Sequence, residues 1–268
     1  MIHTLRAAII LLAGTVAAAA QNAPADAVKD LAPTGTLRAA INSTNVVLVQ
    51  KDAATGALSG ITVDLARELA RRLGVPIVLN EYRGAGTVFA AAKADAWDIG
   101  FVAIEPVRAA EINFTAPYVL VEGGYLVPVN SPLKAIAEVD RTGVRVGVGL
   151  GSAYDLYLTR TIKNATLHRA KTGGWEATIG IFRAEKLDVA ASVKVPLVAY
   201  AKTQSDVRLI DGSFMEIQQA MGTPKGRGEA GVRYLKAFVE DVKQSGFVAD
   251  ALRRASQPDA TVAPPAAN

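Results

Sequence analysis

Arg108 is the residue of this sequence best placed to hold an anion, because it follows a short apolar run. The run, residues 99–104, has the length and the branched residues of a buried strand. Pro106 stands where the first turn of a helix would begin, a position that tolerates its missing N–H. An arginine at the exit of such a strand can grip a carboxylate with paired donors. The alternative is a surface arginine paired with Glu105 or Glu111.

Ser152 is a second candidate for the same task, because it follows a glycine turn and precedes a helix. A strand predicted at residues 144–148 leads into the turn at 149–151, and a helix is predicted at 153–162. The free N–H groups and the dipole of a helix N-terminus attract an anion. We therefore expect Arg108 and Ser152 to hold one carboxylate from opposite sides.

Several kinds of chemistry are excluded by the residues that are missing. The chain has no cysteine and only two histidines, His3 and His168, so we expect no metal site and no cofactor. Ser152 lies in G-L-G-S-A, which is not the G-x-S-x-G motif of serine hydrolases. The glycines at 147, 149 and 151 do not have the G-x-G-x-x-G spacing of a dinucleotide site.

The N-terminus is typical of a secretory signal peptide. Residues 1–6 carry a positive charge, residues 7–16 are apolar, and small residues follow at 17–20. We expect cleavage after Ala20 or Ala23 and a periplasmic location, with residues 1–20 removed. A membrane anchor is the alternative, but the apolar stretch is short for a span of about 20 residues. A lipid-anchored lipoprotein would need a cysteine after this segment, and the chain has none.

Composition favours a layered α/β protein with small-molecule partners. The chain has 268 residues, of which 50% are hydrophobic and only 6% aromatic, enough for one large domain or two small ones. Removal of Arg6, the only charged residue before Asp26, changes the net charge from +4 to +3. The positive charges are scattered, so we expect no nucleic acid partner. We expect a monomer.

The chain alternates between predicted strands and helices in two successive units. The first unit has strands at 37–41, 75–79 and 99–104 and helices at 62–73 and 87–94, the second of these capped by Thr87. The second unit has strands at 144–148, 166–169, 187–192 and 207–210 and helices at 153–162, 175–186 and 195–202. Such alternation predicts largely parallel sheets. Residues 113–118 and 119–129 are expected as two extended pieces between the units.

This alternation predicts an α/β fold of two lobes with a ligand cleft between them. We expect lobe 1 to begin with residues 34–126, lobe 2 to span 127–219, and 220–255 to return to lobe 1 and end in two helices. Residues 21–33 are expected to be a flexible lead-in, and 256–268 a disordered tail, because they lack periodicity.

From Gly35 to Arg254 the chain resembles the extracellular solute-binding proteins of amino-acid ABC importers, family 3. The similar stretches are LSGITVDLA (58–66), WDI (97–99), PVRAAEINFTAPY (106–118), GVGLGS (147–152) and SGF (245–247). The resemblance implies a two-lobed periplasmic-binding-protein fold of type II. It implies a receptor that closes on its ligand and delivers it to an ABC permease of the inner membrane.

The resemblance also implies roles for particular residues. Arg108 corresponds to the arginine that binds the α-carboxylate in this family. Gly151 and Ser152 correspond to the turn whose amide and hydroxyl meet the same carboxylate. Asn45 stands where a loop aromatic often covers the ligand.

Two departures from the family pattern affect the expected ligand. Gly100, Phe101 and Ala103 replace polar residues that usually follow the strand before the arginine. The acid that usually takes the α-amino group would lie near Ser192 and Val193, and neither is acidic. Burying an ammonium group without a charged partner is costly. The sequence therefore predicts a site that still binds the ligand carboxylate but lacks the usual acidic partner for an α-amino group.

Glu105, three residues before Arg108, could supply a negative charge instead; the alternative is that it pairs with Arg108 or with solvent. Phe101 and Tyr154 could form aromatic walls of the cleft. Their alternatives are core packing for Phe101 and a solvated helix face for Tyr154.

Four further residues complete the sequence-based expectations. Gln218 and Gln219 are further polar candidates near the second crossing between the lobes. Trp97 and Trp175 are expected to be packing residues.

The function predicted from these residues is that of a periplasmic receptor, not an enzyme. Its ligand would be a small carboxylate or an amino-acid-like molecule, and its protein partner an ABC permease. One alternative is a periplasmic enzyme of the cyclohexadienyl or arogenate dehydratase type, which would need a positioned acid such as Glu105. Another is a ligand sensor for a membrane receptor.

Overall fold

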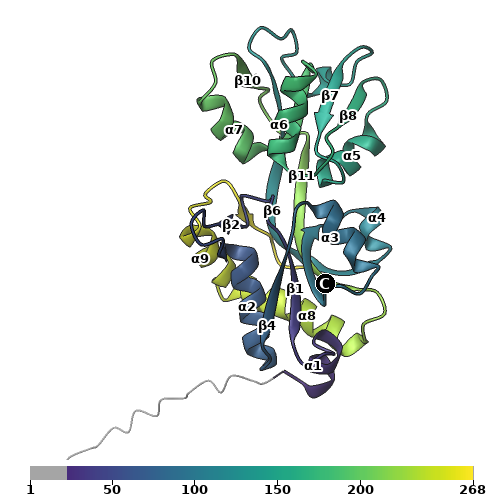
Figure 1. Ribbon diagram of the computed structural model, residues 1–268, viewed down its shortest axis with the longest axis vertical. Helices are drawn as coiled ribbons and strands as arrows, with labels where there is room; N and C mark the ends of the chain where they lie inside the picture. Colours follow the sequence, from purple (N-terminus) through teal and green to yellow (C-terminus); the bar gives the residue numbers. More distant parts are fainter. Residues whose placement is uncertain (1–22, 268) are drawn as a thin grey trace, which may run out of the picture.

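The computed structural model describes residues 23–267, which form two α/β lobes joined by long strands (Figure 1). Lobe 1, below in the figure, contains both ends of the described chain, and lobe 2, above, is built from its middle. Strands β6 (Ile112–Pro128) and β11 (Met215–Pro224) pair antiparallel and run between the lobes. The two-lobed α/β architecture expected from the sequence is confirmed.

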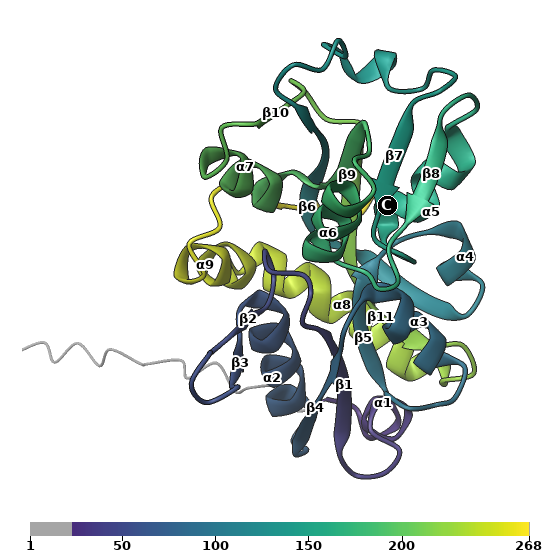
Figure 2. The ribbon, with the colours of Figure 1, turned by 45° about the horizontal axis from the view of Figure 1, so that its top comes forward.

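Lobe 1 is built on three parallel strands. The central strand β1 (Leu37–Asn42) lies between β4 (Ile77–Tyr82) and β5 (Ile99–Ala103), and β11 pairs antiparallel with β5. The helices of this lobe are α1 (Ala25–Leu31), α2 (Ile61–Leu73), α3 (Ala85–Ala92), α4 (Pro106–Ala109), α8 (Glu229–Gln244) and α9 (Phe247–Arg254). A small hairpin of β2 (Gln50–Lys51) and β3 (Leu58–Ser59) precedes α2. Figure 2 shows α2, α9 and α8 side by side next to these strands.

Lobe 2 repeats the same plan. Strand β7 (Arg145–Val148) lies between β8 (Thr166–Arg169) and β9 (Val189–Val193), parallel to both, and β9 and β10 (Val207–Leu209) pair antiparallel with β6. Its helices are α5 (Ala153–Thr161), α6 (Trp175–Ala184) and α7 (Lys194–Lys202), with a 3-10 turn, η1 (Ile136–Glu138). The strand order β4-β1-β5-β11-β6-β9-β7-β8 therefore continues from one lobe into the other.

Helix α2 shows how a local pattern determined an element. Leu65, Leu69 and Leu73 recur at four-residue steps and are buried against the sheet. The helix ends at Gly74, whose φ of 70° is left-handed and therefore suits glycine. The helix predicted at residues 62–73 is confirmed.

Two details of the predicted elements are wrong. Residues 113–118 and 119–129 belong to one strand, β6, because β11 pairs along most of its length. Thr87 does not cap α3, which begins at Ala85. Its hydroxyl instead donates to the carbonyl of Gly84 within the first turn, at 2.7 Å.

The expected flexible lead-in at residues 21–33 is wrong for its described part, because residues 25–31 form α1. Ala27 and Leu31 of this helix are buried. Asp30 accepts a hydrogen bond from the amide of Gly231 at the start of α8, at 2.9 Å. The contact joins residues 201 positions apart, so no local pattern could indicate it.

The tail expected to be disordered at residues 256–268 is ordered in its described part. Strand β12 (Thr261–Val262) pairs with β6, and the amide of Ala263 donates to the carbonyl of Tyr118 at 3.1 Å. The ammonium group of Lys243, a largely buried side chain, donates to the carbonyl of Pro264 at 2.9 Å. The tail braces the strand that links the lobes.

We expect removal of residues 256–268 to lower the free energy of unfolding by about 1–2 kcal/mol, because a few buried hydrogen bonds lose their partner. Urea unfolding of the truncated and full-length chains measures this change. Removing only residues 266–268 is the control, since in the described part of that segment it breaks one exposed hydrogen bond, from the amide of Ala266 to Glu240, and leaves β12 intact. Equal unfolding midpoints for both truncations would contradict a bracing role.

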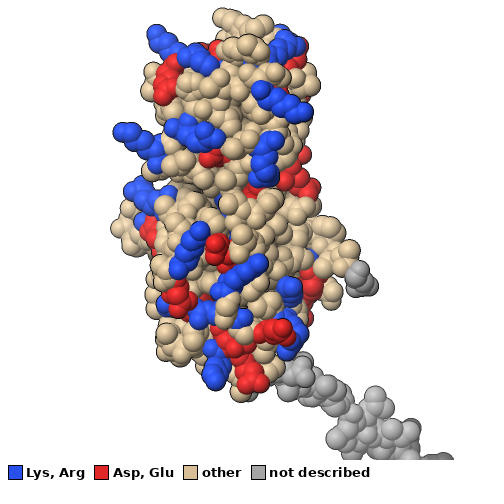
Figure 3. Space-filling model, turned by 90° about the vertical axis from the view of Figure 1, so that its right-hand side faces the viewer, with Lys and Arg blue, Asp and Glu red and all other residues tan. Residues whose placement is uncertain are grey.

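The predicted signal peptide at residues 1–20 lies outside the described residues. Within residues 23–267, no helix is long and apolar enough to cross a membrane. On the face drawn in Figure 3, cationic and anionic side chains are interspersed over both lobes.

Candidate functional site

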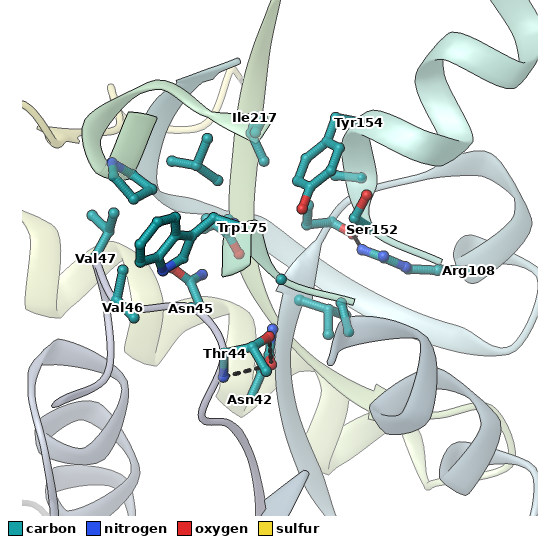
Figure 4. A pocket seen from close by; sticks show the side chains of 18 residues that line it. Asn42, Thr44, Asn45, Val46, Val47, Arg108, Ser152, Tyr154, Trp175 and Ile217 are labelled. Atoms are coloured by element: carbon teal, nitrogen blue, oxygen red, sulfur yellow. Dashed lines mark hydrogen bonds between the residues drawn. The ribbon is translucent and has the colours of Figure 1, made fainter. Parts of the chain in front are cut away.

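A small cavity lies where the two lobes meet, beyond the ends of β5 and β7 (Figure 4). Its volume is about 50 Å³, and on this measure one water needs roughly 10–15 Å³. Both lobes contribute to its lining, which consists of Asn42, Thr44, Asn45, Val46, Val47, Ala85, Val102, Ala103, Arg108, Ser152, Ala153, Tyr154, Gly174, Trp175, Val193, Pro196, Ile217 and Gln219.

Arg108 reaches this cavity from α4, immediately after β5. Pro106 occupies the first helical position, and the carbonyl of Glu105 accepts the amide of Arg108 at 2.9 Å. The arginine is only 1% exposed, so the alternative of a surface ion pair is wrong. Its Nη1 donates to the carbonyl of Ala103 at 2.9 Å, and its Nη2 donates across the junction to the carbonyl of Gly151 at 2.8 Å.

The guanidinium of Arg108 remains charged in its buried position. Burial lowers the pKa of Arg108 to about 10, and the nearby carboxylate of Glu105 opposes that shift. A group with this pKa is almost fully protonated at pH 7. A cation that lines a partly enclosed cavity attracts an anion strongly, because water screens it less there.

Ser152 lines the cavity from lobe 2, as the N-terminal cap of α5. Its Oγ accepts the amide of Asp155 at 3.0 Å, which leaves its hydroxyl hydrogen available to a ligand. Gly151 does not line the cavity. The resemblance implies that an amide of the Gly151-Ser152 turn meets the ligand carboxylate, but the amide of Gly151 donates to Oδ2 of Asp155 at 2.8 Å and that of Ser152 to the carbonyl of Gly149 at 3.2 Å. Of the expected turn, Ser152 alone faces the ligand space.

Glu105 is committed to an ion pair between the lobes. Its side chain is almost fully buried, and Oε2 lies 2.6 Å from Nη1 of Arg160 on α5. This contact is a close ion pair whose angles do not meet those of a hydrogen bond. Both sequence-based alternatives are therefore wrong: Glu105 does not line the cavity, and its carboxylate pairs with neither Arg108 nor solvent. A second buried carboxylate, that of Asp155, is paired with Arg169 of the same lobe at 2.9 Å.

With the geometry of the site established, comparison with known proteins identifies the family. The description "Bacterial extracellular solute-binding proteins, family 3" matches residues 37–255. The chain belongs to this family. No curated protein sequence matches the chain.

Solved structures of solute-binding proteins share the fold of this family 3 member at low identity. A mutant of ArgBP from T. maritima has 18% identity and a TM-score of 0.70, covering 85% of this chain and 98% of that one. A substrate-binding protein of an amino acid ABC transporter from Streptococcus pneumoniae, bound to L-arginine, has 15% identity and a TM-score of 0.70, covering 88% and 99%. An ancestral amino-acid-binding protein, a precursor of cyclohexadienyl dehydratase, has 20% identity and a TM-score of 0.69, covering 85% and 98%.

The aromatic walls of this family 3 site differ from those expected. Phe101 is buried at 4% exposure and packs edge-on against Tyr118, with ring centroids 6.2 Å apart, so the core-packing alternative holds. Tyr154 lines the cavity at 3% exposure, and the alternative of a solvated helix face is wrong. Burial raises the pKa of the Tyr154 phenol, which therefore stays neutral and able to donate at physiological pH.

Neighbouring strand positions explain two further differences from the expected site. Gln218 is exposed, whereas Gln219 is buried and lines the cavity, because successive side chains of β11 point to opposite faces. Ser192 is buried behind the lining with its hydroxyl unpartnered, whereas Val193 lines the cavity. Only the register of β11 opposite β5, with Gln219 beside Ala103, identifies the correct glutamine.

The two tryptophans have different environments. Trp97 is fully buried in lobe 1 and its Nε1 donates to the carbonyl of Val88 at 2.9 Å, as expected of a packing residue. Trp175, expected to do the same, instead lines the cavity from the first turn of α6. Its Nε1 is buried and has no hydrogen-bond partner. Ala103 and Asn45 line the cavity from lobe 1.

The lobes touch along a seam of glycines beside the cavity. Gly84 and Gly86 of lobe 1 face Gly151 and Gly173 of lobe 2. A Cβ built on Gly86 would lie 3.4 Å from the Cα of Gly151, and one built on Gly173 would lie 3.3 Å from the Cα of Gly84. The absence of side chains lets the two backbones approach closely in this closed arrangement.

Proposed function

We propose that this family 3 member is the periplasmic substrate-binding receptor of an ABC importer. It binds a small carboxylate or an amino-acid-like ligand, and two lobes close around the ligand. The observation that carries the proposal is Arg108, a buried cation in a cavity lined by both lobes and linked by hydrogen bonds to each. Export with removal of residues 1–20, action as a monomer and docking to an inner-membrane permease are parts of the same proposal.

The position of Glu105 favours a binding function over a dehydratase activity, because Glu105 is the acid that such an enzyme would use. Glu105 would need to reach the substrate, but its carboxylate is held by Arg160 and lies outside the cavity lining. A general acid must lie within hydrogen-bond reach of the atom that it protonates.

A thermal-shift screen tests the proposed function. The panel contains amino acids, carboxylates without an amine, amines without a carboxylate, and prephenate-like acids. A ligand at about 100 times its Kd adds roughly 2.7 kcal/mol, which raises the Tm by a few degrees. We expect shifts only with compounds that carry a carboxylate. A shift with the amines alone, or no shift at all, would refute a carboxylate receptor.

A further inference from the structure

The charged side chains in and around the cavity indicate which charges the ligand can carry. Among the described residues that line the cavity, Arg108 carries the only formal charge. The two buried carboxylates nearby, Glu105 and Asp155, are each paired with an arginine of lobe 2 and do not line it. The wall of the cavity therefore presents one positive charge and no carboxylate.

The rest of the lining is neutral and mostly aliphatic. Its apolar side chains are Ala85, Val46, Val47, Val102, Ala103, Ala153, Val193, Pro196 and Ile217. The polar ones are the amides Asn42, Asn45 and Gln219, the hydroxyl groups of Thr44, Ser152 and Tyr154, and the indole of Trp175. These groups suit a ligand with one charged end and a short aliphatic body.

Trp175 covers the lobe 1 side of the cavity from the opposite lobe. Figure 4 shows its indole ring next to Asn45, with Val46 and Val47 on the same side. Asn45 has no aromatic ring, so the aromatic cover on this side of the cavity comes from Trp175 of α6. The buried, unpartnered Nε1–H of Trp175 can donate to an oxygen but cannot accept from an ammonium.

We infer that the ligand is a small aliphatic monocarboxylate that carries no ammonium group and lies under the ring of Trp175. The inference rests on the proposed function and narrows its ligand class. The carboxylate neutralises Arg108, whereas the ammonium of an amino acid would be buried among neutral groups. The face of one indole stabilises a desolvated ammonium by less than desolvation costs. Cationic amino acids would add positive charge to a cavity wall that is already positive.

Matched pairs of ligands test this inference by calorimetry. Propanoate and L-alanine, 3-methylbutanoate and L-valine, and 4-methylpentanoate and L-leucine differ only in the α-ammonium. For the pair that fits best, we expect the carboxylate to bind at least tenfold more tightly, which corresponds to about 1.4 kcal/mol. L-Arginine and L-lysine should not bind.

The outcomes separate this inference from the proposed function. Amino acids that bind as tightly as their carboxylate partners, and lose binding in Arg108→Ala, would overturn the inference alone. No binding by any of these compounds would also overturn the inference alone, because the proposed function admits other carboxylates. Carboxylates that bind equally well to Arg108→Ala would overturn the proposed function and the inference with it.

Tryptophan fluorescence tests the position of Trp175 separately. The protein has two tryptophans, and Trp97 lies buried in lobe 1 outside the cavity lining. We expect the bound carboxylate to change the emission of the wild type and of Trp97→Phe, but not of Trp175→Phe. Trp175→Ala should weaken binding about tenfold, because the ligand loses its apolar cover. A ligand response that persists in Trp175→Phe would overturn the assignment.

Discussion

Arg108→Ala is expected to weaken binding of the carboxylate ligand by about 2–4 kcal/mol, because a desolvated anion would lose its charged partner. Arg108 is the only formal charge among the described lining residues, so no second cation compensates. Arg108→Lys should give an intermediate loss, since it keeps the charge and removes the planar fork. Calorimetric titration of the ligand found in the screen measures both values.

Two checks separate lost binding from lost folding in this experiment. The alanine variant leaves the carbonyls of Ala103 and Gly151 without their donor, so its unfolding midpoint is measured first and binding is titrated well below it. Arg233→Ala is the matched control, because Arg233 is exposed on α8 and its one ion-pair partner among residues 23–267 is Glu229. We expect this control to change neither stability nor affinity by more than about 0.5 kcal/mol. Wild-type affinity in Arg108→Ala would refute the role of this arginine.

Gly86→Val is expected to raise the Kd of the ligand about a hundredfold, or roughly 2.8 kcal/mol, by preventing the lobes from closing. A valine at this position would bring methyl groups against Gly151 and the carbonyl of Leu150 in the opposite lobe. An open arrangement removes that collision but also separates Arg108 from Ser152. Gly173→Val should have the same effect from the other side of the seam.

These two glycines are suitable because neither has a left-handed φ, unlike Gly84, Gly151 and Gly174. Replacing either residue therefore avoids the strain of a left-handed backbone. Gly86→Val is the cleaner test of contact between the lobes, because a Cβ built on Gly173 also lies 3.3 Å from the carbonyl of Leu150 in its own lobe. Gly180→Val in α6 is the control, because nothing lies within 4 Å of a Cβ built there.

Small-angle scattering provides the readout for closure. We expect the wild type and the Gly180→Val control to become more compact when ligand is added, and the seam variants to remain extended. Ligand-induced compaction of Gly86→Val, with unchanged affinity, would contradict a role for the seam in closure.

The residues that form the site come from both lobes. Arg108 in lobe 1 supplies the charge, and α5 and α6 of lobe 2 supply Ser152, Tyr154 and Trp175. The ion pair of Glu105 with Arg160 and the bond from Arg108 to Gly151 also cross the junction. In the proposed receptor, ligand binding and lobe closure therefore stabilise each other.

The sequence alone determined the elements whose causes are local. Alternating predicted strands and helices indicated two α/β lobes, and apolar spacing with a terminal glycine placed α2. Pro106 at a helix start after a buried strand placed Arg108 at the exit of β5, and the glycine turn placed Ser152 as a helix cap. Propensity, capping and periodicity act within a few residues, so they can be read directly from the chain.

Only the tertiary structure decided which side chains share the cavity. Gln219 and not Gln218 faces it because of the register of β11 on β5. Phe101 points into the core, although its neighbours Val102 and Ala103 line the cavity. Trp175 lies opposite Asn45 because α6 of one lobe meets a loop of the other.

The partners of charged groups and of the chain ends were also decided by the tertiary structure. Glu105 pairs with Arg160, 55 residues further along (160 − 105), and β12 joins β6 across more than a hundred residues. Composition led to the expectation of a disordered tail at residues 256–268, because it could not reveal the strand edge of β6 with which Thr261 and Val262 pair. Such contacts depend on strand pairing and lobe closure, which bring distant residues together after each element has formed.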